Sequence, residues 1–293
     1  MNIAIFRHII AQKARAFFEI TKFRLSITVV FSGAFGFILA SSQLDWVKLI
    51  LFCVAAFCTT AAANIINQII EIDLDKLMSR TQNRPLPSGK LTISEAAMFG
   101  AIMAIIATYI LFYHLNMKAG LLAILSMVLY GFVYTPMKRV GPIAVAIGAL
   151  PGAFPPLIGW VAAKNHFGLE PGILFAIQFF WQFPHFWAIA WVLDEDYKKA
   201  GFKLLPSKGG KDLNSAIQIM IYTLFLLPLC WVPHYLGMTG INSGVIASIC
   251  GVLFLAQTFH LMRKIDRKAA LQLMFGSFAY LPLVQIAYLF DKL

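Results

Sequence analysis

Apolar runs long enough to cross a membrane dominate this chain. They cover residues 25–42, 46–70, 93–113, 117–135, 141–162, 170–193, 214–235, 240–261 and 271–290. A transmembrane helix needs about 20 predominantly apolar residues, because its backbone polar groups must be hydrogen-bonded within the segment. Only 13% of the residues are charged, whereas soluble domains carry about 25%. The sequence therefore predicts an all-α polytopic membrane bundle of about nine transmembrane helices, forming a single domain over residues 1–293.

The basic residues are distributed unevenly between the two sides of this bundle. Of the 24 Lys and Arg residues, all but Lys48, Lys118, Lys164 and Lys292 fall on one side when these runs are taken as spans. The positive-inside rule assigns the basic side to the cytoplasm. It therefore predicts a cytoplasmic N-terminus and a C-terminus on the opposite side. Residues 1–20 alternate apolar and basic positions, which predicts an amphipathic helix on the cytoplasmic surface.

The net charge of +11 does not indicate a nucleic-acid partner. The basic residues are spread over loops that alternate with spans, so they form no continuous patch for a phosphate backbone. Their ordinary roles are to set topology and to contact anionic membrane lipid. The cysteines lie in apolar segments and form no CxxC pair, which favours small buried hydrophobic residues.

A first acidic segment, residues 64–90, reads NIINQIIEIDLDKLMSRTQNRPLPSGK. On a helix, Asn67, Glu71 and Asp75 advance by only about 40° per step, so they share one face. Carboxylate and amide oxygens suit Mg²⁺, which completes its shell with water and substrate phosphate. Arg80 and Arg84 follow, and guanidinium groups suit phosphate oxygens. These residues indicate a magnesium–diphosphate site. The alternative is a solvated helix end whose acids pair with nearby basic residues.

The NxxxExxxD pattern, continued by DKLMSRTQNRPLPSG, resembles the first aspartate-rich motif of the UbiA-type intramembrane prenyltransferases. A second stretch, residues 130–160, contains YTPMKR and GAFPPLIGW, which resemble the haem O synthase (protohaem IX farnesyltransferase) branch of that family. Lys138 lies here, on the side of the acidic segments. Small residues permit close helix approach, whereas Pro151, Pro155 and Pro156 are expected to bend or break the span.

A second acidic segment, residues 179–207, contains WQFPHF followed by DEDYKKAG, and it resembles the same branch. Other branches carry a DxxxD pair here, but Ala200 stands four residues after Asp196. Asp194 and Asp196 cannot share one helical face. We therefore assign metal–diphosphate work to Asp196, and Lys199 is a further candidate for the diphosphate.

His185 lies 11 residues before Asp196, so it is expected to face the same way and to lie about 16 Å deeper. A histidine inside a span usually faces a cavity or a helix partner. Two interpretations stay open, a hydrogen-bonded core histidine and a contact to a macrocycle. The second would be shared with Trp181, whose ring offers flat apolar surface.

The resemblance implies farnesyl transfer from farnesyl diphosphate to a vinyl group of haem B, giving haem O and diphosphate. It implies that Asn67, Glu71, Asp75 and Asp196 hold Mg²⁺ and that Arg80, Arg84, Lys138 and Lys199 bind diphosphate. It also implies a multi-pass protein of the bacterial inner membrane, with haem A synthase or haem-copper oxidase assembly factors as downstream partners.

Two other functions are compatible with parts of the sequence. A prenyltransferase with a phenolic or quinone-precursor acceptor would share the first acidic segment, but WQFPHF and the missing second DxxxD acid argue against it. A cation-coupled transporter could use an intramembrane Asn/Glu/Asp cluster as an ion site. Transporters place such sites near mid-membrane on broken helices, whereas these acids follow the ends of spans.

Overall fold

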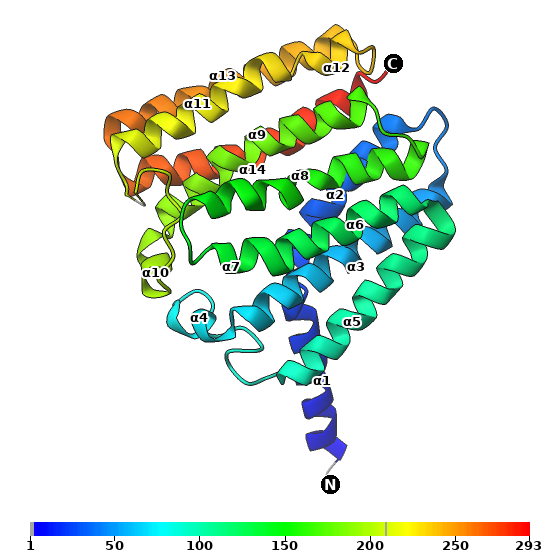
Figure 1. Ribbon diagram of the computed structural model, residues 1–293, viewed down its shortest axis with the longest axis vertical. Coiled ribbons are helices and arrows are strands. Elements are labelled where there is room, and N and C mark those ends of the chain that lie inside the picture. The colour runs from blue at the N-terminus through cyan, green and yellow to red at the C-terminus, as the bar shows by residue number, and fades with distance from the viewer. Residues whose placement is uncertain (1–2, 209) are drawn as a thin grey trace.

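The computed structural model describes residues 3–208 and 210–293, with side chains from residue 10 onward, and this part of the chain is helical apart from loops and turns. It contains 9 helical segments that are long and apolar enough to cross a membrane (Figure 1). These segments coincide with the nine apolar runs of the sequence to within a few residues, so the predicted all-α membrane bundle is confirmed.

Within the described residues the spans are built from nine longer helices, some of which are continued by short helical segments. The spanning set is α2 (Phe23–Ala40), α3 (Trp46–Ile70), α5 (Ile93–Ile110) with η1 (Leu111–Leu115), α6 (Met117–Val128) with η2 (Leu129–Tyr134) and α7 (Thr135–Met137), α8 (Ile143–Lys164), α9 (Leu169–Val192), α11 (Leu213–Leu229) with α12 (Val232–Tyr235), α13 (Ile241–Lys264) and α14 (Arg267–Phe290). The remaining helices are α1 (Ile3–Ile20), α4 (Ile72–Leu77) and α10 (Asp194–Lys199).

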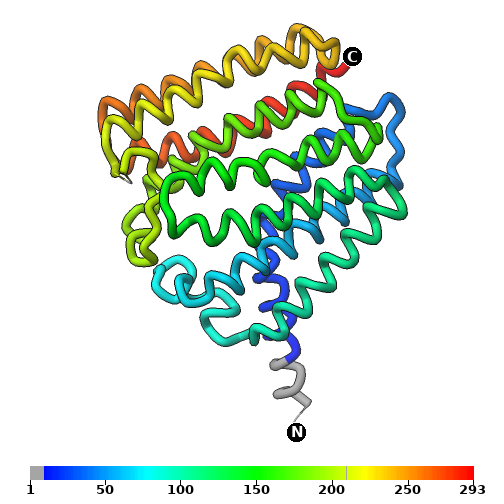
Figure 2. The backbone as a smooth tube through the Cα atoms, in the orientation of Figure 1, coloured from blue at the N-terminus to red at the C-terminus, as the bar shows by residue number. Residues whose placement is uncertain are grey.

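The bundle brings both acidic segments to the same end. Helix α2 packs on α3 and α8, α8 packs on α9, and α9 packs on α11 and α14. In Figure 1 the short helices α4 and α10 lie at one end of the bundle, whereas α12 and the C-terminus lie at the other. The trace in Figure 2 shows α10 next to the loop that follows α4 at that first end.

Helix α1 precedes the first span and contacts the N-terminal part of α5. The Lys13 ammonium lies 2.6 Å from a Glu95 carboxylate oxygen, and Ala16 and Ile20 are buried. Ile10 and Phe18 are exposed, which gives the described part of α1 one buried and one open face. Residues 1–2 of the predicted amphipathic segment lie outside the described chain.

Glycines bring α2 and α8 into direct backbone contact. A Cβ atom on Gly36 would overlap the carbonyl oxygen of Pro156, and one on Gly159 would overlap the carbonyl oxygen of Gly33. In a bilayer, where no hydrophobic force draws helices together, such close contacts supply packing energy. The contact therefore fixes α8 against the first span.

Helix α8 runs unbroken from Ile143 to Lys164 despite its internal prolines, so the break that Pro151, Pro155 and Pro156 suggested does not occur. Pro156 has no N–H, which leaves the carbonyl of Gly152 without its helical partner. Two side-chain amides of α9 replace it, since Gln178 Nε2 and Gln182 Nε2 donate to that carbonyl at 2.8 and 3.0 Å.

Candidate active site

The first acidic segment folds as the end of α3 followed directly by α4. Glu71 forms the junction with φ −98° and ψ 11°, but helical spacing continues through it. The Glu71 amide donates to Asn67 at 3.0 Å, and the Asp75 amide donates to Glu71 at 2.8 Å. Asn67, Glu71 and Asp75 consequently lie on one face, and all three are buried. This segment is not a solvated helix end.

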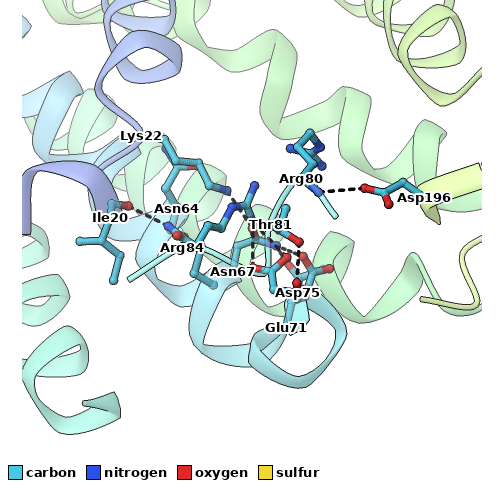
Figure 3. A network of polar contacts seen from close by, with 12 residues as sticks. Ile20, Lys22, Asn64, Asn67, Glu71, Asp75, Arg80, Thr81, Arg84 and Asp196 are labelled. Carbon is cyan, nitrogen blue, oxygen red and sulfur yellow. Dashed lines mark hydrogen bonds and ion pairs between the residues drawn. The ribbon is translucent and has the colours of Figure 1, made fainter. Parts of the chain in front are cut away.

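Each of these side chains has a specific polar partner (Figure 3). Asn67 Nδ2 donates to Glu71 Oε2 at 2.9 Å. The Lys138 ammonium lies 2.9 Å from both Glu71 oxygens, although its geometry toward Oε1 is that of an ion pair without a hydrogen bond. Arg84 donates to both Asp75 oxygens at 3.0 and 2.8 Å through one nitrogen, Nη1. Two buried carboxylates are thus balanced by two cations.

Lys22 is a third cation at this cluster, and the sequence analysis counted it only as a topological charge. It stands in the left-handed conformation, with φ 50°, between α1 and α2. Its Nζ donates to Asn67 Oδ1 at 3.0 Å. Burial, followed by the positive charges of Arg84 and Lys138, lowers the pKa of Lys22 well below its ordinary value. The only local feature that marks Lys22 for this contact is its place, after Thr21, between the end of α1 and the start of α2.

The YTPMKR stretch reaches the same cluster through a π-helical turn. Thr135 accepts a hydrogen bond from Asn67 Nδ2 at 3.1 Å and donates to the Tyr130 carbonyl at 2.9 Å. The Lys138 ammonium lies 4.9 Å from the Tyr134 ring centroid. Segments of π-helix are rare and often occur at functional sites. The wider turn of η2 here precedes the two residues that contact Asn67 and Glu71.

The second acidic segment forms α10, and its two aspartates have different partners. Asp194 is buried and lies 2.9 Å from Lys198 and 3.2 Å from Lys211, so it anchors the loop before α11. Asp196 accepts hydrogen bonds from the backbone amides of Ser79 and Arg80 at 2.9 and 3.2 Å. It therefore joins the two acidic segments through the backbone of residues 79–80 (Figure 3).

The pKa of Asp196 is about 2. Burial of the carboxylate raises this pKa, but hydrogen bonds from the backbone amides of Ser79 and Arg80 and from the Lys199 ammonium lower it by a larger amount. Lys199 donates to Ser79 Oγ at 2.8 Å and to Asp196 at 3.2 Å, which adds a side-chain bridge beside the backbone one. With this pKa the carboxylate of Asp196 is ionised at any physiological pH. The side chain of Arg80, unlike its backbone amide, has no part in this contact and is exposed.

His185 does not share a partner with Asp196. Its Nδ1 lies 2.9 Å from Ser277 Oγ on α14, and its ring stacks on Trp181 with centroids 4.3 Å apart. Trp181 Nε1 donates to the Ser277 carbonyl at 3.0 Å. The structure therefore brings the predicted pair His185 and Trp181 together, but against α14 and away from the loop that Asp196 holds.

The donor set at the first segment suits a hard cation. Within the described residues no group of three or more His, Cys, Asp or Glu side chains gathers around one point. The cluster instead offers two carboxylates and one amide, with Glu71 Oε1 lacking a hydrogen-bond donor. Mg²⁺ commonly takes one or two protein carboxylates and fills its shell with water and phosphate. The residues present therefore fit Mg²⁺ together with a phosphorylated substrate.

The sequence matches the model of the UbiA prenyltransferase family over residues 29–281. It is 56% identical over 284 residues to a protein of Cytophaga hutchinsonii named protoheme IX farnesyltransferase, covering 97% of this chain and 99% of that one. A protein of the same name from Christiangramia forsetii is 43% identical over 281 residues, covering 94% and 93%.

Solved structures share the fold at lower sequence identity. A digeranylgeranylglyceryl phosphate synthase superposes with a TM-score of 0.80 at 24% identity, covering 95% of this chain and 98% of that one. A UbiA homologue from Archaeoglobus fulgidus, bound to DMAPP and Mg²⁺, superposes with a TM-score of 0.67 at 14% identity, covering 91% and 99%.

Proposed function

This chain belongs to the UbiA prenyltransferase family, and we propose that it transfers the farnesyl group of farnesyl diphosphate to a vinyl group of haem B. The products are haem O and diphosphate. The proposal is carried by the identity of 56%, over nearly the whole of both chains, to a relative named protoheme IX farnesyltransferase. The buried cluster of Asn67, Glu71 and Asp75 supplies the chemistry that such a transfer needs.

We propose Asn67, Glu71, Asp75 and Asp196 as the residues that hold Mg²⁺ with the diphosphate. The first three lie together, whereas Asp196 would join them from α10 after releasing the backbone of residues 79–80. When bound, Mg²⁺ neutralises charge that develops on the leaving diphosphate. A divalent metal is supported by the solved Archaeoglobus fulgidus homologue, which holds Mg²⁺ with a prenyl diphosphate.

We propose that the cations that pair with the carboxylates change partner and bind the oxygens of the diphosphate. In the structure Arg84 and Lys138 pair with Asp75 and Glu71, and Lys22 donates to Asn67. A metal would compensate the two carboxylates, so these cations could turn to the phosphate oxygens without loss of charge balance. Arg80 and Lys199, at the edge of the site, would complete the set.

The bonds change as follows in the proposed reaction. The allylic C–O bond of farnesyl diphosphate breaks, and its electrons leave with the diphosphate. The terminal vinyl carbon of the porphyrin bonds to the farnesyl C1, which leaves positive charge on the neighbouring carbon. Water adds there and releases one proton to the medium. The apolar spans hold the farnesyl chain and limit water until that step.

His185 and Trp181 are proposed to contact the porphyrin. Their rings stack face to face beside Ser277 of α14. We expect His185→Gln to keep the protein folded while haem affinity falls and the absorbance of bound haem shifts. An unchanged haem spectrum and affinity would return His185 to the role of a hydrogen-bonded core residue.

One incubation tests the whole proposal. Purified protein is supplied with Mg²⁺, farnesyl diphosphate and either haem B or 4-hydroxybenzoate, and the products are identified by mass spectrometry. We expect haem O in the first mixture and no prenylated product in the second. Prenylation of 4-hydroxybenzoate would assign a phenolic acceptor. Consumption of farnesyl diphosphate in neither mixture would reopen the transporter interpretation.

The chain is a polytopic membrane protein of a family found in bacteria. We propose that it lies in the inner membrane, with the N-terminus and both acidic segments at the cytoplasmic face, as the distribution of basic residues favours. Labelling of single introduced cysteines by an impermeant reagent in intact cells tests this orientation. Transfer of the product to haem A synthase or to haem-copper oxidase assembly factors stays a prediction.

A further inference from the structure

The end of the bundle remote from the carboxylates carries a polar pocket. It has a volume of about 150 Å³ and lies between the end of α2, the start of α3 and the end of α8. Its lining includes Ser41, Ser42, Gln43, Lys48 and Lys164. Lys48 precedes Asn67 by 19 residues of α3, which corresponds to about 28 Å of helix. A diphosphate bound at the first acidic segment could not reach this pocket, so the pocket is a separate site.

The lysines that the charge distribution leaves on this face gather around the pocket. Lys48 and Lys164 line it, and Lys292 donates to the carbonyls of Ile38 and Ser41 at its α2 side. Lys118 donates at 2.9 Å to the carbonyl of Asn165, the neighbour of Lys164. This face, otherwise poor in basic residues, therefore concentrates its positive charge at one point.

The opposing charge within the pocket is small. Asp45 is the acidic residue of the lining; it accepts a hydrogen bond from the Lys48 amide at 3.0 Å as the N-cap of α3. Its other oxygen lies 3.7 Å from Lys48 Nζ. Burial, and then the charge of Lys164, lower the pKa of Lys292. The pocket thus has an uncompensated preference for an anion.

The surface beside the pocket is apolar and open. Trp46, Val47 and Ile50, on the first turns of α3, have exposed fractions of 67%, 68% and 60%. These residues lie where a span enters the membrane, the level at which tryptophan is enriched. A ligand that combines an anionic group with acyl chains fits both surfaces, whereas a free anion would use only the pocket.

We propose that this pocket binds the phosphate of an anionic phospholipid headgroup through Lys48 and Lys164, with the acyl chains along Trp46, Val47 and Ile50. Lys292 holds the end of α2 in place and adds to the positive potential. The site would anchor the ends of α2, α3 and α8 at the membrane surface opposite the carboxylates.

Native mass spectrometry of the purified full chain tests this proposal. The protein is titrated with phosphatidylglycerol, with phosphatidylcholine, and with phosphatidylglycerol in the presence of millimolar inorganic phosphate. The test variant is Lys48→Gln with Lys164→Gln. The matched control is Lys264→Gln with Lys268→Gln, which removes the same charge at the opposite end of the bundle.

We expect the test variant to bind the first phosphatidylglycerol about tenfold more weakly and the control variant to bind it as the parent does. Asp45→Asn, which keeps the N-cap of α3, should bind it more tightly and covers the case in which the double variant fails to fold. Equal weakening in both double variants, equal binding of phosphatidylcholine, or displacement of the lipid by inorganic phosphate would overturn the proposal.

Discussion

Asp75 of the first acidic segment and Asp196 of the second are held in opposite ways. Asp75 is fully buried and bound by an arginine side chain, whereas Asp196 lies at the edge of the bundle and accepts backbone amides of residues 79–80. Removing the cation from a buried carboxylate strongly destabilises the folded protein, because the charge stays out of water. A carboxylate at the edge of the bundle is hydrated, so the loss there is small. The carboxylates of the first segment thus depend on a cation, whereas Asp196 holds a loop that it would have to release in order to reach Mg²⁺.

The strongest test of this difference removes the charges of the first segment. Glu71→Gln and Asp75→Asn should each lower the turnover of haem O formation by on the order of 10²–10³, because they weaken electrostatic stabilisation of the leaving diphosphate. Membrane insertion should stay normal. Asp73→Asn is the matched control, since Asp73 lies on the same short helix with its side chain 85% exposed and paired with Lys76.

Retention of activity within a few-fold in both Glu71→Gln and Asp75→Asn would remove the metal–diphosphate assignment. Equal loss in Asp73→Asn would attribute the effect to the total charge of α4 and not to the buried face.

A second test asks whether Arg84 binds diphosphate by its geometry or by its charge. Arg84→Lys should weaken farnesyl diphosphate binding by about 1–2 kcal/mol, roughly tenfold, because lysine cannot present two parallel donors. Haem affinity should hardly change. Arg267→Lys is the control, because Arg267 opens α14 at a basic loop. Equal farnesyl diphosphate affinity in the two variants would exclude the guanidinium as a diphosphate ligand.

A third test concerns the link between the two segments. Asp196→Asn should raise the KM for farnesyl diphosphate about fivefold and lower turnover by a similar factor, because a neutral amide accepts the two backbone hydrogen bonds less strongly and would be a weaker ligand for Mg²⁺. Limited proteolysis within residues 79–90 should become faster. Asp194→Asn, which loosens the loop near Lys211 instead, should leave proteolysis at 79–90 unchanged. Turnover equal to that of the parent would remove Asp196 from the proposed metal ligands and leave it only the role of holding the loop.

The smallest expected effect is the uptake of a proton by Lys22 when farnesyl diphosphate binds. Because its pKa in the folded protein is lowered below the ordinary value of 10.5, the unfolded chain binds more protons between these two values. The free energy of unfolding should therefore rise with pH between these two values. Below the lower value Lys22 is charged in both states, and burial of that charge destabilises the folded protein. A bound diphosphate favours the charged form and should draw in up to one proton.

Calorimetric titration of farnesyl diphosphate in buffers with different ionisation enthalpies measures this uptake, and Lys22→Met should abolish it. Uptake that is the same in Lys22→Met and in the parent would assign the proton to another group.

The spans could be predicted from the sequence because each is a continuous local pattern, and the structure reproduces them within a few residues. The shared face of Asn67, Glu71 and Asp75 likewise follows from helical periodicity alone. The contacts of Lys22 with Asn67 and of Asp196 with Ser79 join residues 45 and 117 positions apart. No local pattern encodes such pairings, so the role of Lys22 was missed and the partner of Asp196 could not be foreseen.

The same limit applies to the expectation that α8 is bent or broken, of which the break does not occur. Its prolines are a local signal for a break, but the compensation comes from Gln178 and Gln182 on the next helix. Resemblance to a family proposes the residues of the site, and the three-dimensional arrangement shows which partner each of their side chains contacts.

The carbonyl of Gly152, which has no helical N–H partner, also constrains how the protein is assembled during synthesis. A carbonyl without a donor costs several kcal/mol in hydrocarbon, so α8 alone is a poor candidate for release from the translocon into lipid. Its two donors lie on α9, the very next segment to emerge from the ribosome. We therefore expect the two helices to leave the translocon as a pair, with the amide side chains of α9 already bonded to the carbonyl. The order of the helices along the chain places the donors directly after the acceptor.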